Sequence, residues 1–151
     1  MNYLVDIGGE VKAKGNKPDG EEWKVGIEKP SKDKKDQRDL KAVITLKDKS
    51  IATSGNYRKF YEENGIRYSH TINPKTGYPV QHSLLSVSVM AESTAIADAY
   101  ATAFMVMGLE EAKSYISKES VLEAFFIYAD EQGNYQTYAS KGFKTYITEE
   151  Y

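Results

Sequence analysis

The sequence predicts an α+β fold, in which a mainly antiparallel sheet built from hairpins carries two consecutive helices at about residues 94–107 and 109–118. Two observations lead to this prediction. Strand-like runs follow one another in pairs across short turns, whereas the two helix-like runs are adjacent, an order typical of α+β domains rather than of alternating βαβ folds. The chain has 151 residues, the size of one ordinary domain. We therefore expect residues 1–151 to form a single domain.

The composition excludes several classes of protein. Hydrophobic residues make up 40% and charged residues 28% of the chain, as in globular domains, so a disordered or collagen-like chain is excluded. Lys plus Arg number 20 and Asp plus Glu number 22, and we expect no nucleic-acid partner because such proteins usually carry a basic excess. There is no apolar run long enough for a transmembrane helix. The absence of Cys excludes disulfides, thiol catalysis and thiolate metal ligands.

The first strands are predicted from short apolar runs next to turn residues. Residues 3–7 are expected to form a short buried strand that ends at two glycines. Residues 10–14 alternate apolar and charged side chains, which is typical of a half-exposed strand. The turn-forming composition of residues 15–20 then predicts that residues 23–27 return beside it as the second strand of a hairpin.

The next third of the chain is predicted to contain a charged loop and two hairpins. Residues 28–39 hold five basic and four acidic residues, and this mixture of signs favours a solvated loop over a polyanion-binding patch. Residues 41–46 and 50–53 are expected to form one hairpin. Residues 57–61 and 66–70 are expected to form the other, around a turn that contains Asn-Gly.

The second half begins with a rigid loop and is predicted to end in strands. Residues 73–79 contain two prolines and one glycine, which predicts a stiff turn. Residues 84–91 are β-branched, serine-rich and alternating, as in a strand. Residues 122–129 and 135–139 are expected to form a closing hairpin, and residues 141–147 a last strand.

The helices are predicted from their caps and periodicity. Ser93 or Thr94 is suited to cap a helix over residues 95–107, and Gly108 is suited to end it. Residues 109–118 place their apolar side chains on one face, which predicts a second, amphipathic helix.

The first helix contains the most informative polar residue. The segment is apolar on nearly every side, which is typical of a buried helix, and Asp98 is the only charged residue between Ser93 and Leu109. A buried carboxylate has to be paired, coordinated or protonated. Thr102 lies one helical turn further on the same face, and a carboxylate with a hydroxyl suits a hard cation such as Mg²⁺. The alternative is that Asp98 helps to cap the helix and Thr102 donates to a backbone carbonyl.

A second candidate segment surrounds the stiff turn. His70 comes at the end of a strand, where it could accept a proton from a hydroxyl, since its reference pKa is near the working pH. The alternative is a histidine satisfied by a backbone carbonyl. Asn73 and Thr76 suit turn positions with side-chain-to-backbone hydrogen bonds. His82 lies in a polar stretch and is expected at the surface.

Two small-residue turns, at residues 6–10 and 52–57, also follow predicted strands. Their glycines allow a planar or phosphorylated ligand to approach the backbone closely. Neither matches a P-loop or a dinucleotide-binding fingerprint. By themselves they read as ordinary hairpin turns.

Five segments, taken in order, resemble the motifs of the ApbE family: 5–10 (VDIGGE), 23–27 (WKVGI), 52–58 (ATSGNYR), 68–79 (YSHTINPKTGYP) and 97–103 (ADAYATA). Members of this family are FAD:protein FMN transferases, and the similarity extends over essentially the whole chain. The resemblance implies that FAD and Mg²⁺ bind, and that FMN passes from FAD to a threonine or serine hydroxyl of a partner protein with release of AMP. Two alternatives stay open: a Mg²⁺-dependent FAD pyrophosphatase, which would release FMN and AMP, and a non-catalytic flavin-binding or interaction module.

The resemblance also implies roles for individual residues. Asp98 and Thr102 stand at metal-binding positions of the family. His70 stands at the histidine of a Ser-His motif, where it would activate or position the acceptor hydroxyl. Cofactor-binding positions around the flavin are Ile72, Gly9, Ser54, Gly55 and Thr76.

The chain departs from the family pattern in three respects. Asn73 stands where members often have Asp, and Ala101 where some carry a further metal carboxylate. Family proteins are longer, so the chain resembles the C-terminal half of such an enzyme. We expect apolar surface to be exposed where an upstream half would pack, and homo-oligomers to form through it.

Family habit also implies a location and a class of partner. The first residues show no secretion signal, yet the enzymes are usually periplasmic or cell-surface, membrane-anchored lipoproteins. Their acceptor proteins are subunits of redox pumps or extracytoplasmic electron-transfer proteins.

Overall fold

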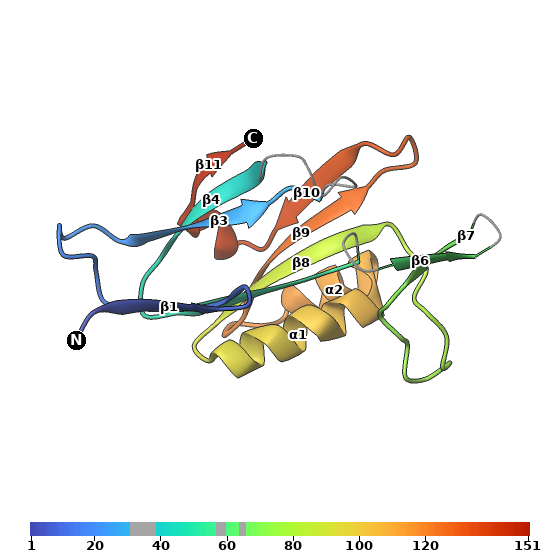
Figure 1. Cartoon of the computed structure of the whole chain (residues 1–151), viewed down its shortest axis with the longest axis horizontal. Helices are drawn as coiled ribbons and strands as arrows, with labels where there is room; N and C mark the ends of the chain where they lie inside the picture. The colour runs from blue at the N-terminus through green and yellow to red at the C-terminus, as the bar shows by residue number, and fades with distance from the viewer. Residues whose placement is uncertain (31–38, 57–59, 64–65) are drawn as a thin grey trace.

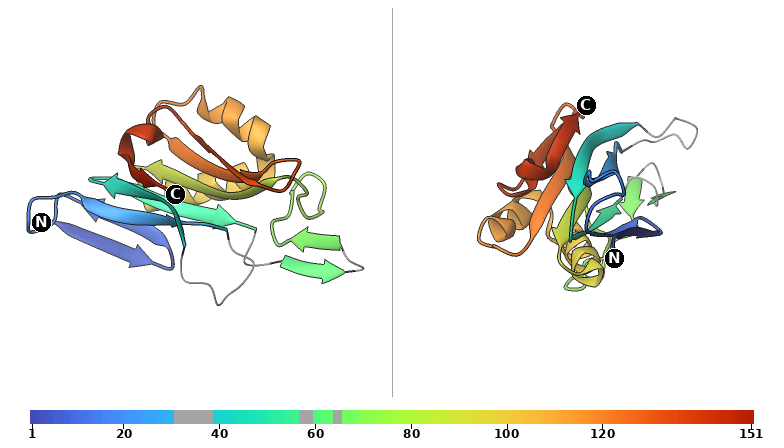
Figure 2. Two further views of the ribbon diagram at one scale, coloured as in Figure 1. Left: turned by 90° about the horizontal axis from the view of Figure 1, so that it is seen from above. Right: turned by 90° about the vertical axis from the view of Figure 1, so that its left-hand side faces the viewer.

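Three layers form the molecule: a three-stranded sheet, a six-stranded sheet and a pair of helices (Figures 1 and 2). This arrangement is seen in a computed structural model that describes residues 1–30, 39–56, 60–63 and 66–151. Strand pairing within the described sheets is antiparallel throughout. The predicted α+β class, with antiparallel sheets and two consecutive helices, is confirmed.

The six-stranded sheet is the middle layer. Its strands, in spatial order, are β1 (Tyr3–Ile7), β2 (Glu10–Lys14), β5 (Ser50–Gly55), β8 (Leu84–Ala91), β9 (Glu123–Ala129) and β10 (Tyr135–Ala139). The central strand β8 is buried over almost its whole length, because one face packs against the helices and the other against the second sheet. The predicted strands 3–7, 10–14 and 84–91 and the closing hairpin are therefore confirmed.

The three-stranded sheet has the order β11 (Ile147–Glu150), β4 (Leu40–Leu46) and β3 (Trp23–Glu28). Two predicted hairpins are wrong here. Strand β3 pairs with β4, as Val25 with Ile44, and not with β2. Strands β4 and β5 lie in different sheets, although only residues 47–49 separate them. The short connection crosses between layers, and Leu46 and Ile51 on either side of it belong to the same buried core.

The C-terminal segment also differs from its prediction. Residues 141–147 form not a strand but a 3₁₀ helix, η1 (Phe143–Tyr146), and β11 follows it. The carboxylate of Glu123 causes this, because it accepts hydrogen bonds from the Ser140 hydroxyl and from the backbone N–H of Phe143 (3.0 Å). The ring of Phe143 is buried and stacks on Phe125, with centroids 5.6 Å apart.

One further hairpin joins β6 (Phe60–Glu63) to β7 (Ile66–Ser69). It confirms the prediction for this part of the chain, except for residues 57–59 and 64–65, which lie outside the described residues. Residues 31–38 of the predicted charged loop also lie outside them.

Both helices lie on one face of the six-stranded sheet. They are α1 (Thr94–Met107) and α2 (Leu109–Ile116), separated by Gly108 with φ 80°. Ser93 occupies the N-cap position of α1 without a side-chain capping bond. Within the described ranges, neither helix combines the length and apolar character needed to span a lipid bilayer.

The expected complete burial of α1 is wrong. Only one face is buried, formed by Ala97, Ala101, Phe104 and Met105, and this face packs on β5 and β8. Asp98 is exposed at the border of this face, on the same side of the helix as Met105. The alanines allow the helix to lie close to the sheet, but α1 is an outer layer, and its far side remains open to solvent.

Strand β1 is also more exposed than predicted. It is the edge of the six-stranded sheet and pairs with β2 alone. Tyr3, Val5 and Ile7 alternate along one face of it, and Ile7 is 73% exposed. Strand β1 is therefore the clearest example of the exposed apolar surface that we expected.

An aromatic cluster joins α1 to α2 and the sheet. The buried ring of Phe104 has its centroid 5.8 Å from Tyr100, 5.7 Å from Tyr115 and 5.9 Å from Phe126. The hydroxyls of Tyr100 and Tyr115 are 3.2 Å apart. This hydrogen bond is the main cause that raises the pKa of Tyr115 to about 12, with burial and the Glu119 carboxylate adding to it.

Tyr115→Phe is expected to reduce the loss of stability at high pH. An unfolded tyrosine releases its proton near pH 10, whereas Tyr115 in the folded chain retains it to about pH 12. The free energy of unfolding should therefore fall as the pH rises through this window, and fall less in the variant. Urea unfolding followed by circular dichroism at several pH values measures this slope. Tyr78→Phe, at an exposed tyrosine, is the matched control, and equal slopes in the two variants would contradict the prediction.

Candidate functional site

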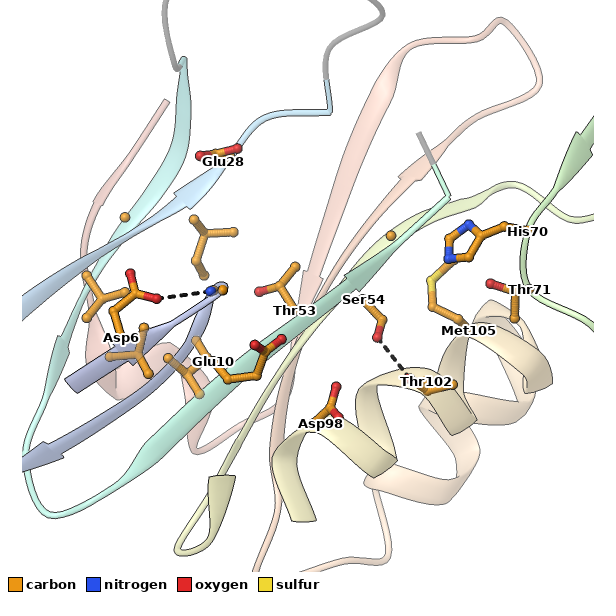
Figure 3. Close-up of a pocket in the computed structure, with 18 of the residues that line it drawn as sticks. Asp6, Glu10, Glu28, Thr53, Ser54, His70, Thr71, Asp98, Thr102 and Met105 are labelled. Atoms are coloured by element: carbon orange, nitrogen blue, oxygen red, sulfur yellow. Dashed lines mark hydrogen bonds between the residues drawn. The ribbon is translucent and has the colours of Figure 1, made fainter. Parts of the chain in front are cut away.

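A cavity of about 1010 Å³ lies where the turn between β1 and β2, the end of β5, helix α1 and the segment after β7 come together (Figure 3). Part of strand β3 also lines the cavity. The cavity thus collects residues that are far apart in the sequence, and the middle sheet positions most of them.

Seven of the eight predicted site residues line this one cavity. They are Gly9, Ser54, Gly55, His70, Ile72, Asp98 and Thr102. The eighth, Thr76, does not line it; its Oγ1 accepts a hydrogen bond from the backbone N–H of Tyr78 (3.3 Å) within the stiff turn. The individual roles of these residues stay predictions.

Asp98 and Thr102 stand one turn apart on α1 and both face the cavity. The Oγ1 of Thr102 is 3.1 Å from the Oγ of Ser54 on β5, so the threonine hydroxyl bonds across to the sheet rather than back to its own helix. Asp98 is exposed, so the expectation that burial forces it to have a partner is wrong: water can solvate its charge.

The edge of β5 presents backbone groups to the cavity. The backbone N–H of Ala13 donates to the carbonyl of Lys49 (3.0 Å), and in an antiparallel ladder such bonded pairs recur at every second residue. The backbone of Ile51 is therefore hydrogen-bonded to β2. If the ladder continued, the backbone of Thr53 would be hydrogen-bonded to Gly9. The chain turns away at Gly9, where φ is 108°, so the N–H and C=O of Thr53 face the cavity without a strand partner among the described residues.

Acidic side chains dominate the charge around the cavity. Asp6, Glu10, Glu28 and Asp98 line it, and Lys24 is the only lysine or arginine among the described lining residues. Figure 3 shows the carboxylates of Glu10 and Asp98 pointing into the same space. An anionic ligand would be repelled here unless a cation accompanied it. The described residues contain no cluster of three or more His, Asp or Glu suited to hold a metal by itself.

The segment after β7 forms the predicted turn, closed by backbone hydrogen bonds. Ile72 forms a β-bridge with Pro79, and the backbone N–H of Val80 donates to the carbonyl of Thr71 (3.0 Å). Asn73 closes the turn, because its carbonyl accepts a hydrogen bond from the N–H of Gly77 (2.8 Å). The residues 70–83, which we call the site arm, therefore hold His70 and Ile72 at the cavity mouth.

His82 was expected at the surface, and this prediction is wrong. The ring is partly buried, and its Nε2 lies 2.7 Å from the backbone carbonyl of Met105 in α1. The polar neighbours of His82 in the sequence gave no sign of this contact, because its partner lies 23 residues away on another element.

Three further lining residues were missed at the level of sequence: Glu10, Thr53 and Met105. Glu10 and Thr53 lie within the two small-residue turns, at residues 6–10 and 52–57, which was a usable signal. Met105 lies three residues beyond Thr102 and shares its side of the helix, but a methionine in an apolar helix reads first as core. Met105 and His70 line the same cavity.

Comparison with known proteins gives this site a context. A protein from Vibrio cholerae named FAD:protein FMN transferase is 42% identical over 147 residues, which cover 97% of this chain and 42% of that protein. The protein of the same name from Escherichia coli K12 is 38% identical over 148 residues, covering 98% and 41%. The chain thus spans about two fifths of the length of the curated relatives it matches.

The fold is shared as well. The apo crystal structure of the flavinyl transferase ApbE from Pseudomonas stutzeri superposes with a TM-score of 0.81 at 37% identity, over 100% of this chain and 45% of that one. The sequence model of the ApbE family matches residues 1–126. These residues contain all the predicted site residues and most of both core layers, and the chain therefore belongs to the ApbE family.

Proposed function

We propose that this chain carries the site at which FMN is transferred from FAD to a threonine or serine hydroxyl of a partner protein, with Mg²⁺ as the required cation and AMP as the second product. One observation carries the proposal: the Asp98–Thr102 pair, His70 and Ile72 line a single cavity, in a chain that is 42% identical to a protein named FAD:protein FMN transferase. Pockets for small ligands have volumes of roughly 300–1,000 Å³, so about 1010 Å³ is enough for a dinucleotide.

The donor atoms fit Mg²⁺. Asp98 and Thr102 offer a carboxylate and a hydroxyl, both hard oxygen donors, and Mg²⁺ is commonly held by one or two carboxylates together with waters and substrate phosphates. The acidic lining supports the same conclusion, because a diphosphate would be repelled in its absence. When bound, the cation would neutralise negative charge on the diphosphate.

The residues of the chain would position the two reactants. Ile72 is 48% exposed beside the cavity, which makes an apolar surface available to the flavin ring. The open N–H and C=O of Thr53 offer one donor and one acceptor to a planar, polar edge, and Gly9 and Gly55 leave room for its approach.

His70 would accept the proton of the attacking hydroxyl. The acceptor oxygen then forms a bond to the phosphorus on the FMN side. The bond from that phosphorus to the bridging oxygen breaks, and AMP leaves with the bridging oxygen. The products are an FMN phosphoester on the acceptor and free AMP, so all atoms are accounted for.

The acceptor proposed is a subunit of a redox pump or an electron-transfer protein outside the cytoplasm. A periplasmic or cell-surface location of the enzyme would match it. Self-association through the exposed face of β1 is proposed as well, because Val5 and Ile7 there are 44% and 73% exposed.

The proposal is tested by incubating the chain with FAD, Mg²⁺ and a threonine-bearing acceptor protein. Chromatography detects AMP, and mass spectrometry detects FMN covalently bound to the acceptor. We expect His70→Asn to slow transfer by about 10²-fold, the lower range for loss of a general base, with little change in FAD affinity. AMP and free FMN without modified acceptor would identify a pyrophosphatase instead. FAD that neither binds nor reacts would leave a non-catalytic module.

A further inference from the structure

His82 joins the two elements that carry the candidate site. Its Nε2 is 2.7 Å from the backbone oxygen of Met105, and because a carbonyl only accepts hydrogen bonds, Nε2 carries the hydrogen. The other ring nitrogen, Nδ1, is buried and has no hydrogen-bond partner among the described residues. The contact with α1 is therefore made through Nε2 alone.

The contact uses a group that the helix leaves open. The last four carbonyls of an α-helix have no partner within the helix. In α1 the carbonyl of Phe104 receives the N–H of Gly108 (3.0 Å), and the carbonyl of Met105 receives His82. Gly108 also leaves room for the ring, since a Cβ at this position would lie 3.1 Å from the Cδ2 of His82.

Both partners of the contact, His82 and Met105, are connected to residues that line the cavity. On one side, His82 follows Val80, whose N–H bonds to Thr71 next to His70. On the other side, Met105 belongs to the helix that carries Thr102, and Met105 itself lines the same cavity as His70 (Figure 3). His82 is not one of the described residues that line the cavity. It therefore acts on the site through its neighbours.

We propose that His82 is a positioning residue, whose Nε2–H bond to Met105 sets the site arm against α1 and so fixes His70 and Ile72 opposite the Asp98–Thr102 pair. The expected effect of His82 on FAD binding rests on the proposed function. Its expected effect on the position of the site arm does not. A broken bond leaves the carbonyl of Met105 unpaired and lets the arm shift relative to the helix.

The test compares two substitutions. His82→Phe keeps a planar ring and removes the donor, whereas His82→Gln keeps an N–H donor at a similar distance from the backbone. Gln81→Ala, at an exposed neighbour, is the matched control. The chain has two histidines and four methionines, so the imidazole and methionine-methyl NMR spectra are simple enough to follow the His70 ring and the Met105 methyl group separately.

We expect the wild-type spectrum to show His82 with hydrogen on Nε2. His82→Phe should shift the Met105 methyl and His70 ring signals and weaken FAD binding in the presence of Mg²⁺ by about tenfold, the usual effect of one hydrogen bond. His82→Gln should restore the signals and most of the affinity, which general destabilisation would not do. Gln81→Ala should change neither.

Three results would overturn the proposal: hydrogen on Nδ1 in the wild type, unchanged signals in His82→Phe, or equal effects of the Phe and Gln variants. The first is measured on the wild-type chain and stands even if a variant fails to fold. If the wild type does not bind FAD, the proposed function fails, while the NMR comparison still decides whether His82 positions the arm.

Discussion

Asp98→Asn is expected to abolish the Mg²⁺-dependent part of FAD binding and to lower FMN transfer by about 10³-fold or more. The amide keeps the size of the side chain and removes its charge. Without that charge the site loses its anionic oxygen donor for the cation, and charge neutralisation by a metal contributes several kcal/mol to such reactions, at about 1.4 kcal/mol per tenfold in rate. Calorimetric titration of FAD into the chain, with and without Mg²⁺, measures the binding effect independently of turnover.

Because Asp98 is exposed, this experiment separates an effect on the site from an effect on folding. An exposed side chain can be changed with little effect on folding, so a lost signal reports on the site. Glu111→Gln removes one carboxylate from an exposed position of α2 outside the cavity lining, and it should leave FAD binding intact. Equal Mg²⁺ dependence in wild type and Asp98→Asn would show that the cation binds elsewhere or is not needed.

Phe104→Ala is expected to lower the free energy of unfolding by about 3–5 kcal/mol, the usual range for truncating a buried phenylalanine. Its ring is fully buried, and it is the only side chain of α1 that contacts the rings of both Tyr115 and Phe126 among the described aromatic pairs. The substitution would leave a cavity between the helices and the sheet. Urea unfolding, followed by circular dichroism, measures the change in midpoint at constant slope.

Ile96→Ala on the same helix is the matched control, because Ile96 is 47% exposed; we expect a change of about 1 kcal/mol or less. Phe104→Leu, which fills part of the space, should fall between the two. A loss in Phe104→Ala as small as that in Ile96→Ala would mean that this aromatic cluster does not hold the helices to the six-stranded sheet.

Local sequence patterns predicted most elements of this fold but not how they combine. The alternation in residues 84–91 and the caps around α1 depend on neighbours in the chain, so they could be read directly. The placement of β4 and β5 in separate sheets could not be predicted from neighbours in the chain. A three-residue connection between two apolar strands normally makes a hairpin, whereas here the two strands lie in different sheets and contribute Leu46 and Ile51 to one core between them.

The same limit applies to the site. Asp98 and Thr102 were found from helical spacing, and Ser54 joins them only because β5 passes beside α1. The exposure of Asp98 could not be predicted, since an apolar helix in the outer layer and one in the core have similar sequences. His82 was missed because its partner is a backbone carbonyl, which leaves no trace in residue type.

The pairing of β11 with β4 also constrains how the chain acquires its structure during synthesis. Ile147 lies opposite Ile44, so the three-stranded sheet cannot be completed until a segment about a hundred residues downstream has emerged from the ribosome. Contacts of such large sequence separation slow folding, and until they form, the apolar side of β4 has no third strand beside it. In the middle sheet only the hairpins β1–β2 and β9–β10 are local, but its other pairings, β2–β5, β5–β8 and β8–β9, still join residues closer in sequence than Ile147 and Ile44. The middle sheet can therefore assemble first and serve as the template on which the last residues close the small sheet.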